Sequence, residues 1–200
     1  MNSRLCASFL SMAALVACVT SGGVNADLRA ELETMFDSDQ SHRLKMQEVA
    51  LKHGSNSPEV FELWKKQEPI DKANLKRLGE IVAAHGWPAI SAVGQKASAA
   101  AFLIVQHSDP TSQKKYLPVL RAAVESGEAQ PQDLALLEDR VLMHEGKKQR
   151  YGSQLQPNGK GGYEFYPIED EVRVDERRKA VGLPPLSEYA KLFGLEYRPK

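Results

Sequence analysis

Residues 97–105 read ASAAAFLIV and form a nearly unbroken apolar run, which the polar residues 106–109, QHSD, end abruptly. The run continues a helical stripe that begins at Val93. Its small alanines allow other helices to approach closely, so we expect a central helix that is buried nearly all round. Downstream, residues 146–154 form a loop rich in hydrogen-bonding side chains. A core helix that stops at polar residues, together with such a loop, is typical of a small binding site.

Helix start and stop signals divide the rest of the chain into further helices. Ser57-Pro58 and Asp109-Pro110 each combine a capping side chain with a proline suited to the first helical position. Gly86, Gly127 and Gly146 are expected to end helices. We predict one or two helices over 27–53, a helix starting at Pro58, and a separate one from Asp71 to His85. The remaining helices are predicted after Asp109, with a kink or restart at Pro118, after Pro131, and over 174–180 and 186–193.

Near the C-terminus the helical pattern of apolar residues gives way to short extended runs. Residues 149–156 and 162–168 are two short runs separated by PNGKG at 157–161. An Asn-Gly turn between extended segments is a strong signal for a β-hairpin. We therefore predict a mainly α fold, a multi-helix orthogonal bundle around a buried central helix, with one small β-hairpin at about residues 149–168.

The first 26 residues have the features of an export signal. Arg4 is followed by a mostly apolar stretch from Leu5 to Val19, which is too short to span a bilayer comfortably. Small residues at Val24 and Ala26 suit signal peptidase cleavage, which predicts a mature start at Asp27. A rival interpretation is a lipobox at Leu15–Cys18, in which Cys18 becomes lipid-modified. Both interpretations place a single helical domain, residues 27–200, in the periplasm or cell envelope.

Composition restricts the partners of this domain. Both cysteines, Cys6 and Cys18, lie in the expected signal, so we expect no disulfide in the mature domain. The full sequence has 26 basic and 26 acidic side chains. Such a balance gives no electrostatic footprint for nucleic acid or for an anionic membrane. Membrane attachment is expected only through a lipid on Cys18.

His107 and Asp109 are the most suggestive pair for chemistry, because they follow the end of the central helix. A carboxylate near a histidine orients and charges it, as in a general acid–base unit. The alternative is structural: Asp109 caps the next helix, and His107 caps the preceding one or bonds a carbonyl.

Arg140 and a polar group nearer the N-terminus are candidates for ligand binding. Arg140 lies in the middle of a predicted helix and is expected to be half buried, which requires a carboxylate or several carbonyls. An ion pair with Asp109 or Asp39 is the favoured explanation, and an anion-binding fork for a ligand carboxylate or phosphate is the alternative. Asp39, Gln40 and Arg43 lie in a polar stretch, 37–43, that we interpret as a solvated face or a helix break. The alternative is that these three side chains point into the site.

The loop residues Gln149, Tyr151 and Gln154 are the last candidates for ligand binding. On a strand, Gln149 and Tyr151 would share a face with Ser153 and line a polar pocket. The alternative is the polar outer face of a hairpin. The five histidines show no metal-ligand spacing and the chain has no phosphate-binding loop, so we expect no metal site and no cofactor.

Five short segments that contain these polar residues or a Gly-Trp-Pro turn follow one another along the chain. They are Asp39-Gln40-x-x-Arg43, His85-Gly86-Trp87-Pro88, residues 105–109, Asp139-Arg140-Val141 and residues 146–154. The ordered set resembles a bacterial family of exported proteins, domain of unknown function family 6624. The family has threonine where this chain has Ser153, which keeps the hydroxyl group. The resemblance carries no activity, but it implies that the polar residues belong to one pattern and converge in space.

Three functional hypotheses follow. The first is an exported, non-enzymatic binding module with a polar pocket for a peptide, a cell-wall fragment or an envelope protein, including a toxin neutralised in the periplasm. Its pocket comprises Asp39, Gln40, Arg43, His107, Asp109, Arg140, Gln149, Tyr151 and Gln154. The second is a metal-independent hydrolase or transferase with His107 as general base, with Asp109 or Asp39 orienting it and with Arg140 holding an anion. The third is a structural protein with a buried polar network.

Overall fold

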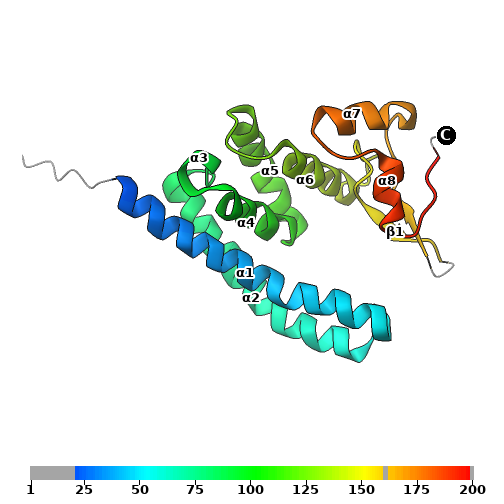
Figure 1. Cartoon of the computed structure of the whole chain (residues 1–200), viewed down its shortest axis with the longest axis horizontal. Helices are drawn as coiled ribbons and strands as arrows, with labels where there is room; N and C mark the ends of the chain where they lie inside the picture. The colour runs from blue at the N-terminus through cyan, green and yellow to red at the C-terminus, as the bar shows by residue number, and fades with distance from the viewer. Residues whose placement is uncertain (1–20, 160–161, 199–200) are drawn as a thin grey trace, which may run out of the picture.

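A computed structural model describes residues 21–159 and 162–198 of the chain. Two long helices, α1 (Ser21–His53) and α2 (Pro58–His85), lie side by side as an antiparallel hairpin (Figure 1). As predicted, Ser57 caps α2, since its hydroxyl accepts a hydrogen bond from the Val60 amide at 3.4 Å. Of the expected export signal, residues 1–20 lie outside the described residues, and the lipobox lies within that segment.

The central helix predicted from the apolar run is α4 (Gln95–Gln106). Ala97, Ala100, Ala101 and Val105 have no exposed surface, which confirms the expected burial. The short α3 (Ile90–Val93) precedes it, and α5 (Pro110–Glu125) and α6 (Pro131–His144) follow it. The helix α4 lies between the α1–α2 hairpin and the α5–α6 pair (Figure 1).

One helix boundary differs from the prediction, and the structure decides two alternatives that the sequence left open. The helix α1 shows no break in the polar stretch 37–43, and α2 runs from Pro58 to His85 through Pro69. Asp71 therefore does not cap a helix; its carboxylate binds Arg43 and Gln67 instead. The helix α5 also continues through Pro118, so the helix does not restart there. Neither proline can donate the backbone hydrogen bond of its helical position, and both helices continue without it.

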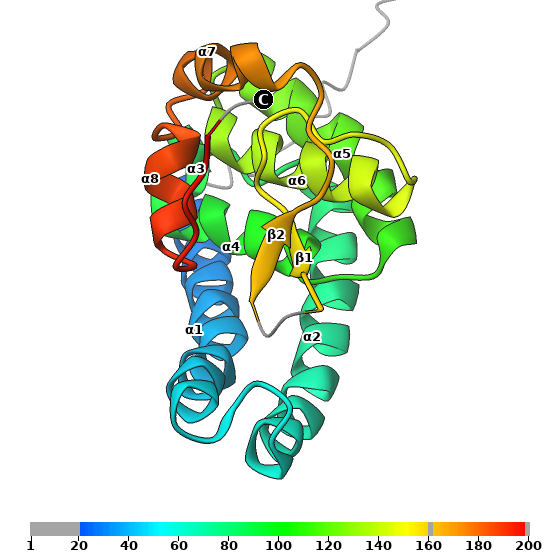
Figure 2. The same cartoon turned by 90° about the vertical axis from the view of Figure 1, so that its right-hand side faces the viewer.

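The C-terminal part holds the predicted hairpin at the end of the molecule that carries the C-terminus (Figures 1 and 2). Strands β1 (Leu155–Pro157) and β2 (Tyr163–Phe165) pair antiparallel, with Leu155 opposite Phe165. The hairpin is confirmed but shorter than expected, because residues 149–154 form an irregular loop. The chain ends in the 3-10 helix η1 (Glu171–Arg173), α7 (Val174–Ala180) and α8 (Leu186–Lys191).

The loop 149–154 is held by a buried carboxylate. Asp139 of α6 is fully buried and accepts the amides of Arg150, Tyr151 and Ser153 at 2.6–3.0 Å. Gly152 has a φ of +70°, and an added Cβ would lie 2.9 Å from Leu186. The loop is therefore fixed both by hydrogen bonds to α6 and by close packing against α8.

We predict that Asp139→Ala lowers the free energy of unfolding by roughly 2–4 kcal/mol, because it leaves three buried amides without acceptors. Urea denaturation followed by circular dichroism measures the loss. The matched control, Asp37→Ala, removes a carboxylate that is 67% exposed and paired with Lys96, and should cost less than about 1 kcal/mol. Equal losses in the two variants would contradict the assigned role of Asp139.

Candidate functional site

The polar centre of the molecule is a contact between α1 and the end of α4. The Nδ1 atom of His107 lies 3.0 Å and 3.1 Å from the two carboxylate oxygens of Asp39. Asp39 is 1% exposed, whereas 22% of the His107 side chain is exposed. No described residue hydrogen-bonds Nε2 of His107. The histidine is thus oriented by a buried carboxylate through one ring nitrogen, and its other nitrogen is left without a partner among the described residues.

The geometry of α1 and α4 explains why Asp39 and His107 meet. Asp39 follows Leu32 and Met35 at spacings of seven and four residues, so it shares their buried face of α1. His107 is the first residue after α4, and its amide still bonds the Leu103 carbonyl at 2.9 Å. The interpretation of 37–43 as a solvated face or a break is therefore wrong for Asp39. The helical spacing of Asp39 from Leu32 and Met35 is the sequence feature that predicts its burial, despite the polar residues around it.

Neighbouring donors keep Asp39 charged. Burial by itself raises the pKa of Asp39, but the hydrogen bond and charge of His107, the charge of Arg43 and a hydrogen bond from Gln40 outweigh it. The net result is a pKa below the ordinary value of 3.8. Nε2 of Gln40 donates to Asp39 at 2.7 Å, and Nε of Arg43 lies 3.5 Å from it. Asp39, Gln40, Arg43 and His107 therefore form one connected cluster.

A second guanidinium approaches this cluster from α6. With its amide oxygen turned toward α6, Gln106 accepts hydrogen bonds from Nε and Nη2 of Arg140 at 2.9 Å and 3.2 Å. Arg140 forms no ion pair with any described residue, and its Nη1 has no hydrogen-bond partner among them. Burial lowers the pKa of Arg140, a nearby Tyr189 opposes this, and the charge of Arg43 lowers it further. Arg140 is thus a half-buried cation without a counterion in the described chain, and it is held by the residue that precedes His107.

Two expectations about acidic partners are corrected. Asp109 is exposed and caps α5: its carboxylate accepts the amides of Thr111 and Ser112 at 2.9 Å and 3.0 Å. It forms no hydrogen bond with His107, because the side chain turns back to its own helix. The ion pair expected for Arg140 with Asp109 or Asp39 does not form among the described residues. The carboxylates are already satisfied by the α5 amides and by Arg43, Gln40 and His107.

The candidate residues of the loop have structural contacts. Gln149 is fully buried; it donates to the carbonyls of Gln154 and Tyr166 and accepts from the Gln154 amide. The Gln154 side chain donates to the Ser153 hydroxyl at 2.9 Å. Tyr151 is buried beneath the Arg150 guanidinium, whose carbon lies 5.7 Å from the ring centre. None of the side chains of Gln149, Tyr151 and Gln154 contacts His107 or Arg140 through a hydrogen bond.

The structure adds residues that the sequence analysis did not select. Asp71 binds Arg43 at 2.6 Å and Gln67 at 2.7 Å, which holds Arg43 from the α2 side. Tyr189 of α8 donates its hydroxyl to the Ser153 carbonyl at 3.0 Å and lies close enough to Arg140 to affect its pKa. Gln67 and Asp71 lie four residues apart on one helix face, but nothing in the sequence pairs them with Arg43.

The described residues hold no group of three or more His, Cys, Asp and Glu side chains arranged to bind a metal ion. Over the same residues, none of the helices combines the length and apolar character that a membrane crossing requires. The polar centre itself consists of one histidine with a fixed ring, two guanidiniums, one buried carboxylate and amide groups. Such a set can bind an anion and can exchange a proton at Nε2 of His107.

We predict a distinct acid response for Asp39→Asn. Because folding lowers the pKa of Asp39, the carboxylate contributes stability above pH 3.8 that is lost as the pH falls through the lower folded value. Each pH unit by which folding lowers this pKa corresponds to about 1.4 kcal/mol of stability. The unfolding free energy of Asp39→Asn should therefore fall less than that of wild type between pH 5 and the acid transition. Urea titrations at a series of pH values measure this.

His107→Leu provides the complementary variant. His107 supplies the largest interactions that lower the pKa of Asp39, so removing it should raise this pKa, and acid unfolding should begin at a higher pH than in wild type. Parallel acid-unfolding curves for wild type and both variants would show that Asp39 and His107 do not interact as described.

Comparison with known proteins gives a family but no activity. Neither the curated proteins nor the solved structures contain a match to this chain. A family model, the family of unknown function DUF6624, matches residues 26–200. The match includes all the residues of the polar centre. The chain therefore belongs to the DUF6624 family.

Proposed function

We propose that this protein is an exported binding module whose polar centre captures a carboxylate group of a peptide or cell-wall fragment. The observation that carries the proposal is Arg140, a half-buried guanidinium with no ion pair among the described residues. A planar guanidinium with an unused edge matches a carboxylate, which it binds through two parallel hydrogen bonds.

The surroundings of Arg140 support an anion rather than a neutral ligand. The amide oxygen of Gln106 accepts hydrogen bonds from Nε and Nη2 of Arg140. It therefore fixes the orientation of the guanidinium without neutralising its charge. Arg43 adds a second positive charge close enough to lower the pKa of Arg140. An anion would relieve this repulsion. When the His107 ring is protonated on both nitrogens, its Nε2–H offers a further hydrogen bond to the anion, and Asp39 sets the orientation of that ring.

Carboxylates are favoured over phosphates because the cationic charge is limited. Arg43 is already paired with Asp71 at 2.6 Å and lies 3.5 Å from Asp39. Of the two guanidiniums, only Arg140 has no counterion among the described residues, which suits a ligand with a single negative charge. Free peptide C-termini and the carboxylates of cell-wall peptides have this charge and occur in the envelope, where the sequence predicts this protein to reside.

We predict that N-acetyl-Ala-Ala binds more tightly than its C-terminal amide, and that Arg140→Gln removes the difference. Isothermal titration calorimetry at low salt measures both affinities. Arg140→Gln should weaken binding of the acid at least about tenfold, because it removes the cation that has no ion pair among the described residues. The control Arg121→Gln changes an arginine of α5 that is paired with Glu138, and should bind like wild type. Equal affinities for acid and amide in wild type would refute the proposal.

A second candidate function rests on His107 alone. A histidine with Nδ1 held by a buried carboxylate and Nε2 without a partner among the described residues has the arrangement of a general base. The bound carboxylate group would then be a substrate anchor in a metal-independent hydrolase or transferase, with His107 accepting a proton.

The two functions separate by their response at position 107. If His107 is a general base, His107→Gln should lower the hydrolysis of a p-nitrophenyl ester at least about 100-fold. Binding of N-acetyl-Ala-Ala should change only a few-fold, because Arg140 remains. No hydrolysis by wild type above the rate in buffer, with carboxylate binding intact, would leave the binding module as the function.

A further inference from the structure

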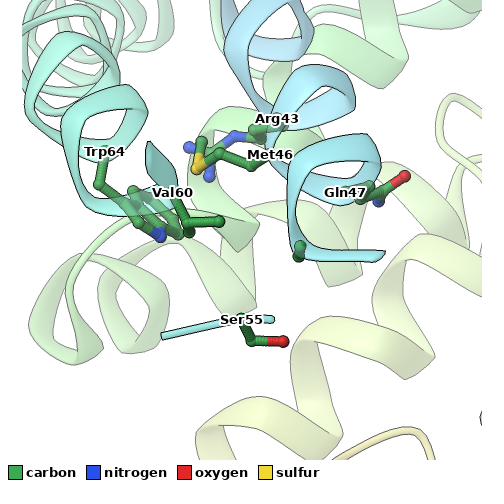
Figure 3. Close-up of a pocket in the computed structure, with 7 residues that line it drawn as sticks. Arg43, Met46, Gln47, Ser55, Val60 and Trp64 are labelled. Atoms are coloured by element: carbon green, nitrogen blue, oxygen red, sulfur yellow. The ribbon is translucent and has the colours of Figure 1, made fainter. Parts of the chain in front are cut away.

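A cavity of about 320 Å³ lies between α1 and α2, beyond the polar centre and toward the loop that joins the two helices (Figure 3). Its lining residues are Arg43, Met46, Gln47, Ala50, Ser55, Val60 and Trp64. Arg43 and Met46 project from α1 toward Val60 and Trp64 of α2. The size is at the lower end of the range of roughly 300–1,000 Å³ for small-molecule sites, which suits a single ring.

The walls of this cavity are mainly apolar. Met46 and Val60 are buried, at 7% and 6% exposure, so they form its floor and cannot be rearranged without disturbing the helix contact. Trp64 is 46% exposed, which leaves part of the indole ring reachable from solvent. An apolar floor with an accessible aromatic edge favours a ligand that buries apolar surface.

The charged residue of the lining is Arg43, and its charge is already balanced. Its Nη2 lies 2.6 Å from Asp71, and its Nε lies 3.5 Å from Asp39. The guanidinium carbon lies 5.4 Å from the centre of the Trp64 ring. Arg43 therefore places an ion-paired, planar guanidinium over the Trp64 indole, and this flat pair favours stacking of an aromatic ring over binding of a second anion.

We propose that this cavity is a second binding site, which takes an uncharged aromatic group the size of a phenylalanine or tyrosine side chain. The site is separate from Arg140, and Arg43 is the residue that touches both the cavity and the polar centre. Trp64 and Arg43 provide stacking surfaces, while Met46 supplies a thioether for contact with the edge of the ring.

The two tryptophans of the chain make the test internally controlled. Trp64 lines the cavity, whereas Trp87 is buried elsewhere at 8% exposure. The indole N–H signals in a ¹H–¹⁵N spectrum, assigned with Trp64→Phe, are followed during titration with three probes of the same ring: benzyl alcohol, benzoate and benzylammonium. Benzyl alcohol should shift the Trp64 signal saturably and leave the Trp87 signal in place. Neither charged probe should bind more tightly.

Filling the cavity should prevent binding. Ala50→Phe from α1, or Val60→Phe from α2 as a second variant, should weaken benzyl alcohol binding at least about tenfold, because the new ring occupies the space that the ligand needs. The control Ala30→Phe places the same side chain on an exposed position of α1 and should bind like wild type. An unchanged Trp87 signal and circular dichroism spectrum verify the fold of each variant.

Three results would overturn the proposal: no saturable shift of the Trp64 signal, full binding in both filled variants, or much tighter binding of benzoate than of benzyl alcohol. The last result would mean that Arg43 acts as a free cation. Arg140→Gln should leave benzyl alcohol binding unchanged, so failure of the carboxylate site and failure of this site are distinguishable.

Discussion

A carboxylate buried where α1 meets the end of α4 determines the polar centre. Asp39 has 1% of its surface exposed, and a buried charge of this kind is tolerated only with compensating donors. Three side chains supply them: His107 from the end of α4, and Gln40 and Arg43 from the following turn of α1. Asp71 of α2 in turn holds Arg43. The charge thus links three helices and fixes the ring of the histidine that faces the site.

Asp139 is a second buried carboxylate, and its charge is compensated in a different way. Its carboxylate is surrounded by backbone amides of the loop 149–154 rather than by cations, and burial raises its pKa despite those hydrogen bonds. The loop is thereby held against α6, and Arg178, itself 1% exposed, bonds the Tyr151 carbonyl from the other side. The adjacent residues Asp139 and Arg140 therefore have separate contacts. Asp139 holds the loop, whereas Arg140 binds Gln106 and has no ion pair among the described residues.

Local signals in the sequence predicted much of the fold. The apolar run over 97–105, the Asp109-Pro110 cap and the Asn-Gly turn each act within a few residues, and α4, α5 and the hairpin followed as expected. Asp71 and Pro118 misled the prediction: Asp71 lies inside α2, where its carboxylate binds Arg43 and Gln67, and α5 continues through the proline. His107 was paired first with nearby Asp109 and only as an alternative with Asp39, because the separation of 39 and 107 along the chain hides a contact that packing creates.

Asp39 fixes the His107 ring, and among the described residues Nε2 of His107 has no hydrogen-bond partner and Arg140 has no ion pair. The ¹⁵N chemical shifts of the His107 ring, recorded with and without acetate, test this arrangement. We predict that the neutral ring carries its proton on Nδ1, and that acetate perturbs Nε2 and the Arg140 guanidinium together. A neutral ring protonated on Nε2, or an acetate response at neither residue, would contradict this claim.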